Sequence, residues 1–191
     1  MPLTKNPKRV VAAAVAAFAL ALVVAPAAGA AVPGPSRGQA HRVDFDAVRA
    51  ATAPYRDLTV AKSVGGYSIK VTDLAGLSCI ADPNGSGAMG VHFANGSLLT
   101  DGAIDALRPE ALIYERRSDG VRHLVAVEYI VFRDAWDADH AQPPRLFGRS
   151  FELIPAGNRY GLPDFYELHA WVWKFNPSGA FADWNPRVHC P

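Results

Sequence analysis

The chain has 191 residues, of which 50% are hydrophobic and 19% charged, and it contains 15 Pro, 16 Gly and two Cys. This length suits one globular domain with appendages. The composition excludes a disordered, collagen-like or coiled-coil protein, because apolar residues are plentiful and charged residues are few. The formal net charge of +1 provides no strongly basic surface, so no nucleic-acid partner is expected.

Residues 1–30 have the pattern of a secretory signal peptide. Three basic residues precede an uninterrupted apolar run over 10–25, and small residues with an Ala28-x-Ala30 spacing follow it. A membrane anchor is the competing interpretation, but the run is shorter than the roughly 20 apolar residues that cross a bilayer. We therefore expect a secreted or extracytoplasmic protein whose mature chain has no membrane span and is slightly acidic.

A leader and a helix are predicted to follow. Residues 31–43 contain Pro and Gly without apolar periodicity, which indicates a flexible leader. From Asp44, which suits an N-cap, apolar residues recur at helical spacing up to the pair Gly65-Gly66. Pro54 removes one backbone hydrogen bond within this stretch, so we expect the helix to be kinked or split there.

After Gly66 the apolar pattern changes to period two or to short continuous runs, as in β-strands. These segments are 67–72, 89–93, 111–114, 124–132, 151–154 and 166–175. Stretches rich in Pro, Gly, Asn and Asp separate them. We predict an α+β fold: one long, kinked N-terminal helix packed on a curved antiparallel sheet of five or six strands, within a single domain over 44–191.

Asp119-Gly120 lies between two apolar runs and predicts a two-residue hairpin turn. The resulting register places Ala111 opposite Glu128, and it separates Glu115 from Glu128 by four residues along the strand, roughly 13–14 Å. These two carboxylates are then too far apart to bind one ion together or to form a glycosidase pair. Glu115 is expected near the turn in solvent, and Glu128 is expected to be buried. A turn longer by one residue would move the register.

Cys79 and Cys190 form an even pair in a chain that is expected to be exported. A disulfide is therefore the predicted state of both residues. The alternative is a catalytic thiol or a soft metal site, which needs a free thiolate. The sequence has no CxxC spacing that would favour that alternative.

Four polar residues interrupt otherwise apolar strands, and they are the candidate metal ligands. Glu128, Glu167 and His169 lie inside apolar runs, and His92 lies in a third strand-like segment. Charged groups in such places destabilise the fold by several kcal/mol unless they are paired, hydrogen-bonded or bound to metal. Imidazole and carboxylate ligands suit zinc, copper or iron, so the expected cofactor is a divalent transition metal.

Two tryptophans near these residues suggest the wall of a ligand pocket. Period two places Trp171 and Trp173 on the same face as Glu167 and His169, and together with Arg159 they are the candidate ligand-binding residues. The alternative is a structural network, in which Glu128 or Glu167 pairs with an Arg such as Arg159 and each His donates to a backbone carbonyl.

Four segments resemble a group of small exported proteins of actinobacterial type. They are GVHF at 90–93, NRYGLP at 158–163, FYELHAW at 165–171 and FADWNP at 181–186. The likeness covers roughly Cys79 to Cys190. The resemblance implies export and a shared fold, and it assigns no activity or catalytic residue.

The sequence contains no GxSxG elbow, P-loop, GxGxxG turn or EF-hand loop. Three hypotheses therefore stand. The first is a secreted domain that binds a small ligand or a transition metal in a sheet-lined pocket. The second is an enzyme that uses the same residues, with a carboxylate or His as general base. The third is an envelope-associated structural or interaction protein without a site.

Overall fold

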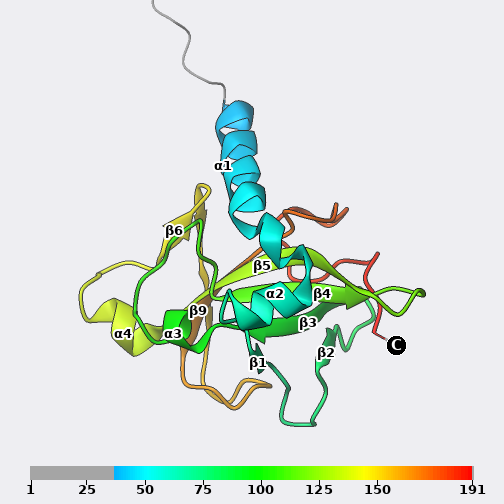
Figure 1. Cartoon of the computed structure of the whole chain (residues 1–191). Helices are drawn as coiled ribbons and strands as arrows, with labels where there is room; N and C mark the ends of the chain where they lie inside the picture. The colour runs from blue at the N-terminus through cyan, green and yellow to red at the C-terminus, as the bar shows by residue number, and fades with distance from the viewer. Residues whose placement is uncertain (1–36, 191) are drawn as a thin grey trace, which may run out of the picture. The chain divides into compact units, whose positions relative to one another are not determined.

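A seven-stranded antiparallel sheet is the centre of the structure, a computed structural model that describes residues 37–190 (Figure 1). The strands are β1 (Ile69–Lys70), β2 (Cys79–Ala81), β3 (Ala88–Ala94), β4 (Ala111–Arg116), β5 (Arg122–Phe132), β8 (Glu152–Ile154) and β9 (Phe165–Ala170). Their order is β1-β3-β4-β5-β9-β8, and β2 also pairs with β3. A separate hairpin joins β6 (Arg145–Leu146) to β7 (Arg149–Ser150). The α+β class is therefore confirmed, with more strands than expected.

The helical segment is divided into three pieces, so the prediction of one long, kinked helix is wrong. These pieces are α1 (Arg37–Thr52), the 3-10 helix η1 (Ala53–Arg56) and α2 (Leu58–Ser63). Pro54 falls within η1, where a missing backbone N–H is tolerated. Asp57 is extended, and its carboxylate accepts from the N–H of Thr59, so it ends the first part and caps α2.

Two short helices, α3 (Gly96–Leu99) and α4 (Arg133–Asp137), complete the secondary structure of residues 37–190. None of the helices in this range has the length and apolar character for crossing a membrane. The expected leader over 31–43 overlaps α1 from Arg37 onward. Its first part, like the expected signal peptide over 1–30, lies outside the described residues.

The sheet is covered differently on its two faces. One face packs against α1, η1 and α2 in the larger apolar cluster, which includes Val48, Ala61, Phe93, Leu112, Tyr129 and Leu168. The other face carries a smaller cluster, in which Ile113, Ala126 and Trp171 contact Val188 near the C-terminus. Along each strand, residues that face the helices therefore alternate with residues that point to the opposite face of the sheet.

The hairpin between β4 and β5 has a three-residue turn, not the predicted two-residue turn. The N–H of Gly120 donates to the carbonyl of Arg117, the N–H of Arg117 donates to Val121, and Gly120 has φ 79°. The longer turn shifts the register near the turn by one residue. A bulge at Val125 compensates, so Ala111 still faces Glu128 as predicted.

Glu115 lies on this hairpin and is buried, contrary to the expectation that solvent surrounds it. Its side chain is 6% exposed, and its carboxylate accepts from Arg117 Nε at 2.9 Å and from Lys174 Nζ. The bulge at Val125 explains the contact between Glu115 and Lys174. The free carbonyl of Val125 accepts from the N–H groups of Trp173 and Lys174, which brings Lys174 beside Glu115.

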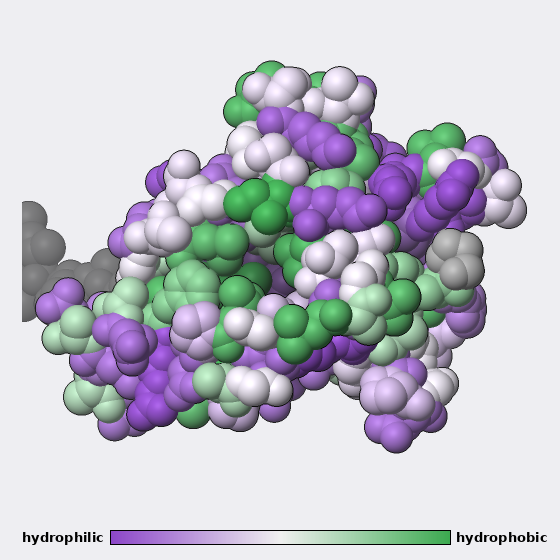
Figure 2. Space-filling model, turned by 90° about the horizontal axis from the view of Figure 1, so that it is seen from below, coloured by the Kyte–Doolittle hydropathy of each residue, from purple (hydrophilic) through white to green (hydrophobic). Residues whose placement is uncertain are grey.

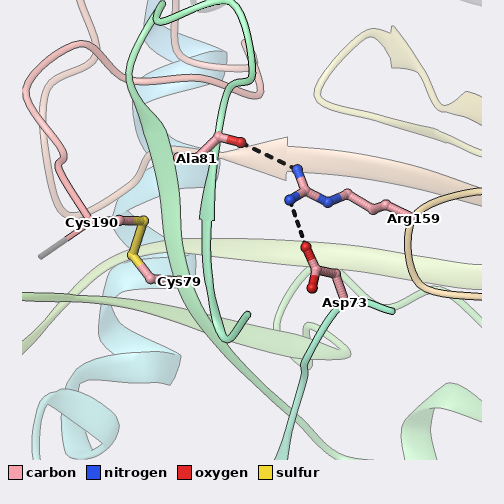
Figure 3. The surroundings of a disulfide bond; sticks show 5 residues. All are labelled: Asp73, Cys79, Ala81, Arg159 and Cys190. Atoms are coloured by element: carbon pink, nitrogen blue, oxygen red, sulfur yellow. Dashed lines mark hydrogen bonds and ion pairs between the residues drawn. A yellow bond between two sulfur atoms is a disulfide. The ribbon is translucent and has the colours of Figure 1, made fainter. Parts of the chain in front are cut away.

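The predicted disulfide between Cys79 and Cys190 is present (Figure 3). The Cα atoms of the two residues are 5.6 Å apart, and 111 positions separate them in the sequence. The bond joins β2 to the last turn of the chain. Backbone hydrogen bonds between Ala88 and Asn185 fix the same segment against β3. The covalent link and this bridge hold the C-terminal segment over the face of the sheet opposite the helices.

Candidate metal centre

The face of the sheet opposite the helices carries a row of polar side chains across three strands. His92 comes from β3, Glu128 from β5 and His169 from β9. Glu128 is directly opposite His169 on one side and opposite Ala111 of β4 on the other. His92 is paired with Ile113 in β4, two residues from Ala111, so it reaches Glu128 diagonally across this strand, and the methyl side chain of Ala111 leaves room for the contact.

Glu128 lies between the two imidazoles. Its Oε2 atom is 3.5 Å from Nε2 of His92, and its Oε1 atom is 3.5 Å from Nε2 of His169. The two rings are nearly perpendicular, with centroids 5.8 Å apart. One ligand atom from each of these residues lies within 4.8 Å of the others. All three residues are buried, so the group is a compact set of two nitrogens and one carboxylate.

These contacts are too long for hydrogen bonds and have the spacing of ligands around an ion. None of the four imidazole nitrogens of His92 and His169 has a hydrogen-bond partner within the described residues. A hydrogen bond between such atoms is about 2.7–3.2 Å long. Two ligand atoms that are each about 2.1 Å from a metal ion lie about 3.0–3.4 Å apart. The observed separations of 3.5 Å are therefore closer to those of metal ligands.

Burial determines the charge of these groups. Burial lowers the pKa of His92 to about 4; the Gly90 carbonyl opposes this effect, and the Arg159 charge adds to it. Burial also lowers the pKa of His169 to about 3. Both rings are therefore neutral at pH 7, which is the form that binds metal. Burial, together with the neighbouring Glu167 carboxyl, raises the pKa of Glu128. A bound dication would reverse this effect, because it favours the ionised carboxylate.

The structure places Glu167 beside this group and adds an acidic residue that the sequence interpretation missed. Glu167, His169 and Asp183 form a second set of ligand atoms within 4.8 Å of one another. Oδ1 of Asp183 is 3.6 Å from Nδ1 of His169. His169 thus has a carboxylate near each ring nitrogen. Asp183 follows the last strand in an irregular loop, where no periodic pattern marks it. Its only signal was its place in the FADWNP segment.

Two cavities meet at the cluster. A pocket of about 90 Å³ has His92, Glu128 and Glu167 on its inner side. Its other walls are mostly apolar: Val71, Ala94, Leu99, Ile130, Phe132, Tyr160, Leu162 and Phe165. A polar cleft of about 320 Å³ is lined by Glu167, His169 and Asp183, so Glu167 borders both cavities. Figure 2, which views the molecule from below, shows a hollow bordered mainly by hydrophobic residues.

Arg159 does not join the cluster. Its guanidinium donates to Asp73 at 2.8 Å and to the carbonyl of Ala81 at 3.2 Å (Figure 3). The alternative in which Arg159 neutralises Glu128 or Glu167 is therefore wrong, and neither cavity at the cluster is lined by Arg159. The same alternative expected each His to donate to a backbone carbonyl, and neither ring does so.

The two tryptophans lie on different sides of the sheet, because β9 ends at Ala170 and a tight turn follows it. Trp171 packs in the smaller apolar cluster, and its indole N–H donates to the carbonyl of Ala182 at 2.6 Å. Trp173 packs against the larger cluster and donates to Thr52 Oγ1 at 3.0 Å. The period-two prediction that both share a face with His169 is therefore wrong for Trp173.

Known proteins do not extend this description. No family model matches the chain, and comparisons with curated proteins and with solved structures find no match. The function must be inferred from the geometry of the site.

Proposed function

We propose that the protein binds a divalent transition-metal ion through Nε2 of His92, Nε2 of His169 and the carboxylate of Glu128. The observation that carries the proposal is the pair of buried, neutral imidazoles whose nitrogens have no hydrogen-bond partner within residues 37–190. Leaving such groups unpaired destabilises a fold by about 1–3 kcal/mol each. Coordination of one ion satisfies one nitrogen of each ring and the carboxylate between them.

The ligand set narrows the class of metal. Two imidazoles and one carboxylate suit Zn²⁺, Fe²⁺ or Cu²⁺, whereas an all-oxygen site would favour Mg²⁺ or Ca²⁺. Three protein ligands leave at least one coordination position for water or a small molecule. The apolar pocket beside His92 and Glu128 supplies a space for that molecule.

The open position also favours a second candidate, an enzyme at the same site. Catalytic zinc centres keep three protein ligands and an open position, whereas structural centres have four. Turnover of a small substrate by the metal-loaded protein, lost in Glu128→Gln, would distinguish this enzyme from a binding protein.

We also propose that the protein is exported from the cytoplasm. The disulfide between Cys79 and Cys190 supports an oxidising compartment, since such bonds are rare in the cytosol. The signal-peptide pattern over 1–30 supports the same location. Detection of the processed chain outside the cytoplasm, with a mature N-terminus near residue 31, would test this part.

Metal analysis of the mature protein, produced without a His tag, tests the metal site. The parent protein should retain metal after dialysis against Zn²⁺ and then against buffer. Glu128→Gln should lose one equivalent relative to the parent, and His169→Ala should lose all tightly bound metal. His123→Ala is the matched control, because His123 lies on the exposed hairpin beside Asp119. A metal-free parent with folded circular dichroism would overturn the proposal, as would a Glu128→Gln variant with the parent's metal content.

A further inference from the structure

The geometry points to a second divalent metal ion on the cleft side of β9, held by Glu167, Asp183 and Nδ1 of His169. The imidazole of His169 would then bridge two ions, with Nε2 on the first and Nδ1 on the second. The inference rests on the proposed metal at Glu128, because both sites share His169.

The contact between His169 and Asp183 has the same form as the contacts at the first site. The Nδ1–Oδ1 distance of 3.6 Å is too long for a hydrogen bond and near the spacing of two ligands of one ion. The side chain of His169 is completely buried, and its Nδ1 has no hydrogen-bond partner within the described residues. An unpartnered ring nitrogen that faces a carboxylate at this distance is the observation that separates a metal site from a mere acidic cluster.

Negative charge gathers on the same side of His169. Glu152 is directly opposite Glu167 in the sheet, and Glu152, Glu167 and Asp183 line one cleft. Glu167 and Asp183 also have ligand oxygens within 4.8 Å of each other, so their negative charges repel when both carboxyls are ionised. A dication between Glu167 and Asp183 would neutralise this repulsion.

The basic residue that lines the cleft is directed toward an aromatic ring and not toward the acidic side chains. Arg149 is the one Lys or Arg among the described residues that line the cleft, and its guanidinium lies over the ring of Phe181, 5.4 Å from the centroid. No ion pair joins Arg149 to Glu167 or Asp183 within residues 37–190. The acidic side chains at His169 thus lack a protein cation as partner there.

The loop that carries Asp183 is fixed before any ion binds. The backbone N–H of Trp171 donates to the carbonyl of Ala180 at 2.9 Å, and its indole N–H donates to the carbonyl of Ala182. Asn176 Nδ2 also donates to Ala182, at 3.3 Å. These bonds hold the residue before Asp183 against the end of β9, so the carboxylate is preorganised beside His169.

Binding of the second ion requires the ring proton of His169 to leave, together with any proton on the carboxyls of Glu167 and Asp183. When the first ion takes the Nε2 lone pair of neutral His169, the remaining ring proton is on Nδ1. The second ion replaces this proton, which passes to water in the cleft, and the resulting imidazolate bonds both ions through its two nitrogens. Two carboxylates and one imidazolate suit Zn²⁺, Cu²⁺ or Mn²⁺.

Metal stoichiometry with the isosteric variant Asp183→Asn tests the inference. The mature parent, loaded with Zn²⁺ and dialysed, should hold about two ions per chain, and Asp183→Asn about one. Glu152→Gln is the matched control: it removes the same charge from the same cleft, and it should keep the parent's stoichiometry. With Cu²⁺, the imidazolate bridge couples the two spins, so the parent should show a reduced paramagnetic resonance signal per copper. Asp183→Asn should show the full signal of one uncoupled copper.

The outcomes separate the two proposals. One ion in the parent and one in Asp183→Asn would overturn the second site and leave the first. One ion in the parent and none in Asp183→Asn would place a single ion at Asp183 and overturn both the bridge and the site at His92. A parent that binds no metal would overturn both proposals together.

Discussion

Two buried glutamates on the hairpin of β4 and β5, Glu115 and Glu128, have opposite surroundings. The side chains are similarly buried, at 6% and 7% exposed. Glu115 accepts hydrogen bonds from Arg117 and Lys174, and although burial opposes its ionisation, these cations lower its pKa. Glu128 is surrounded by neutral imidazoles and another carboxyl, and its pKa is raised.

This difference separates a structural carboxylate from a candidate ligand. Burial of an ionised group is tolerated when a protein cation neutralises it, and Glu115 meets that condition. Glu128 does not, since its neighbours are the neutral rings of His92 and His169 and the carboxyl of Glu167. A carboxylate buried without a cation destabilises the metal-free fold, and an external cation would relieve this destabilisation.

The largest expected effect is on thermal stability when metal is added. An ion that binds only the folded state at 1,000 times its Kd stabilises it by about 4 kcal/mol. For a chain of this length that is a rise in Tm of about 10 °C. We expect Zn²⁺ to raise the Tm of the parent and of Glu115→Gln, and EDTA to reverse the rise. An equal rise in His169→Ala, measured by scanning calorimetry, would show that the metal acts elsewhere.

The two glutamates should also respond oppositely to the same substitution in metal-free protein. Glu115→Gln removes a carboxylate that two cations bind, so it should lower the free energy of unfolding by about 1–2 kcal/mol at pH 7. Glu128→Gln removes a buried carboxyl whose ionisation no protein cation favours, so it should leave the stability unchanged or raise it by about 1 kcal/mol. Urea unfolding in EDTA measures both. A loss of stability in Glu128→Gln as large as that in Glu115→Gln would remove the distinction.

The pH dependence of these differences follows from the directions of the pKa shifts. A lowered pKa stabilises the folded state above the unfolded value, about 4.3, and this stabilisation disappears as pH falls through the folded pKa. The Glu115→Gln difference should thus be complete at neutral pH and shrink only below about pH 4. A raised pKa destabilises the folded state as pH rises above about 4.3. The Glu128→Gln difference should therefore vanish near pH 4.

Strand periodicity was sufficient to predict the candidate site at the level of residues. Apolar runs with single polar interruptions indicated His92, Glu128 and His169, and the structure brings these side chains together. The pairing of Ala111 with Glu128 was also predicted correctly. Periodicity succeeds here because each residue lies within a regular strand, where side-chain direction follows from position.

The errors lie where local backbone irregularity sets side-chain direction. The bulge at Val125, the turn after Ala170 and the break at Asp57 each depend on one or two residues and leave no periodic signal. Asp183 reaches His169 from an irregular loop, and this loop is held in place by a hydrogen bond from Trp171. Tertiary contacts decide these features, so sequence patterns did not predict them.

The smallest expected effect concerns Arg159, whose partner the sequence did not predict. Its ion pair with Asp73 joins two loops, and the Asp73 carboxylate also accepts from the backbone N–H groups of Ala75 and Leu77, so the carboxylate keeps partners when Arg159 is removed. Arg159→Gln should therefore lower the Tm by only about 2–4 °C and leave the metal content of the parent unchanged. If Arg159 served Glu128 or Glu167 as their cation, its removal would increase the negative charge at the cluster and change its metal affinity. Zn²⁺ titration of Arg159→Gln beside the parent distinguishes these cases, and a shift in affinity of tenfold or more would contradict the placement of Arg159 outside the site.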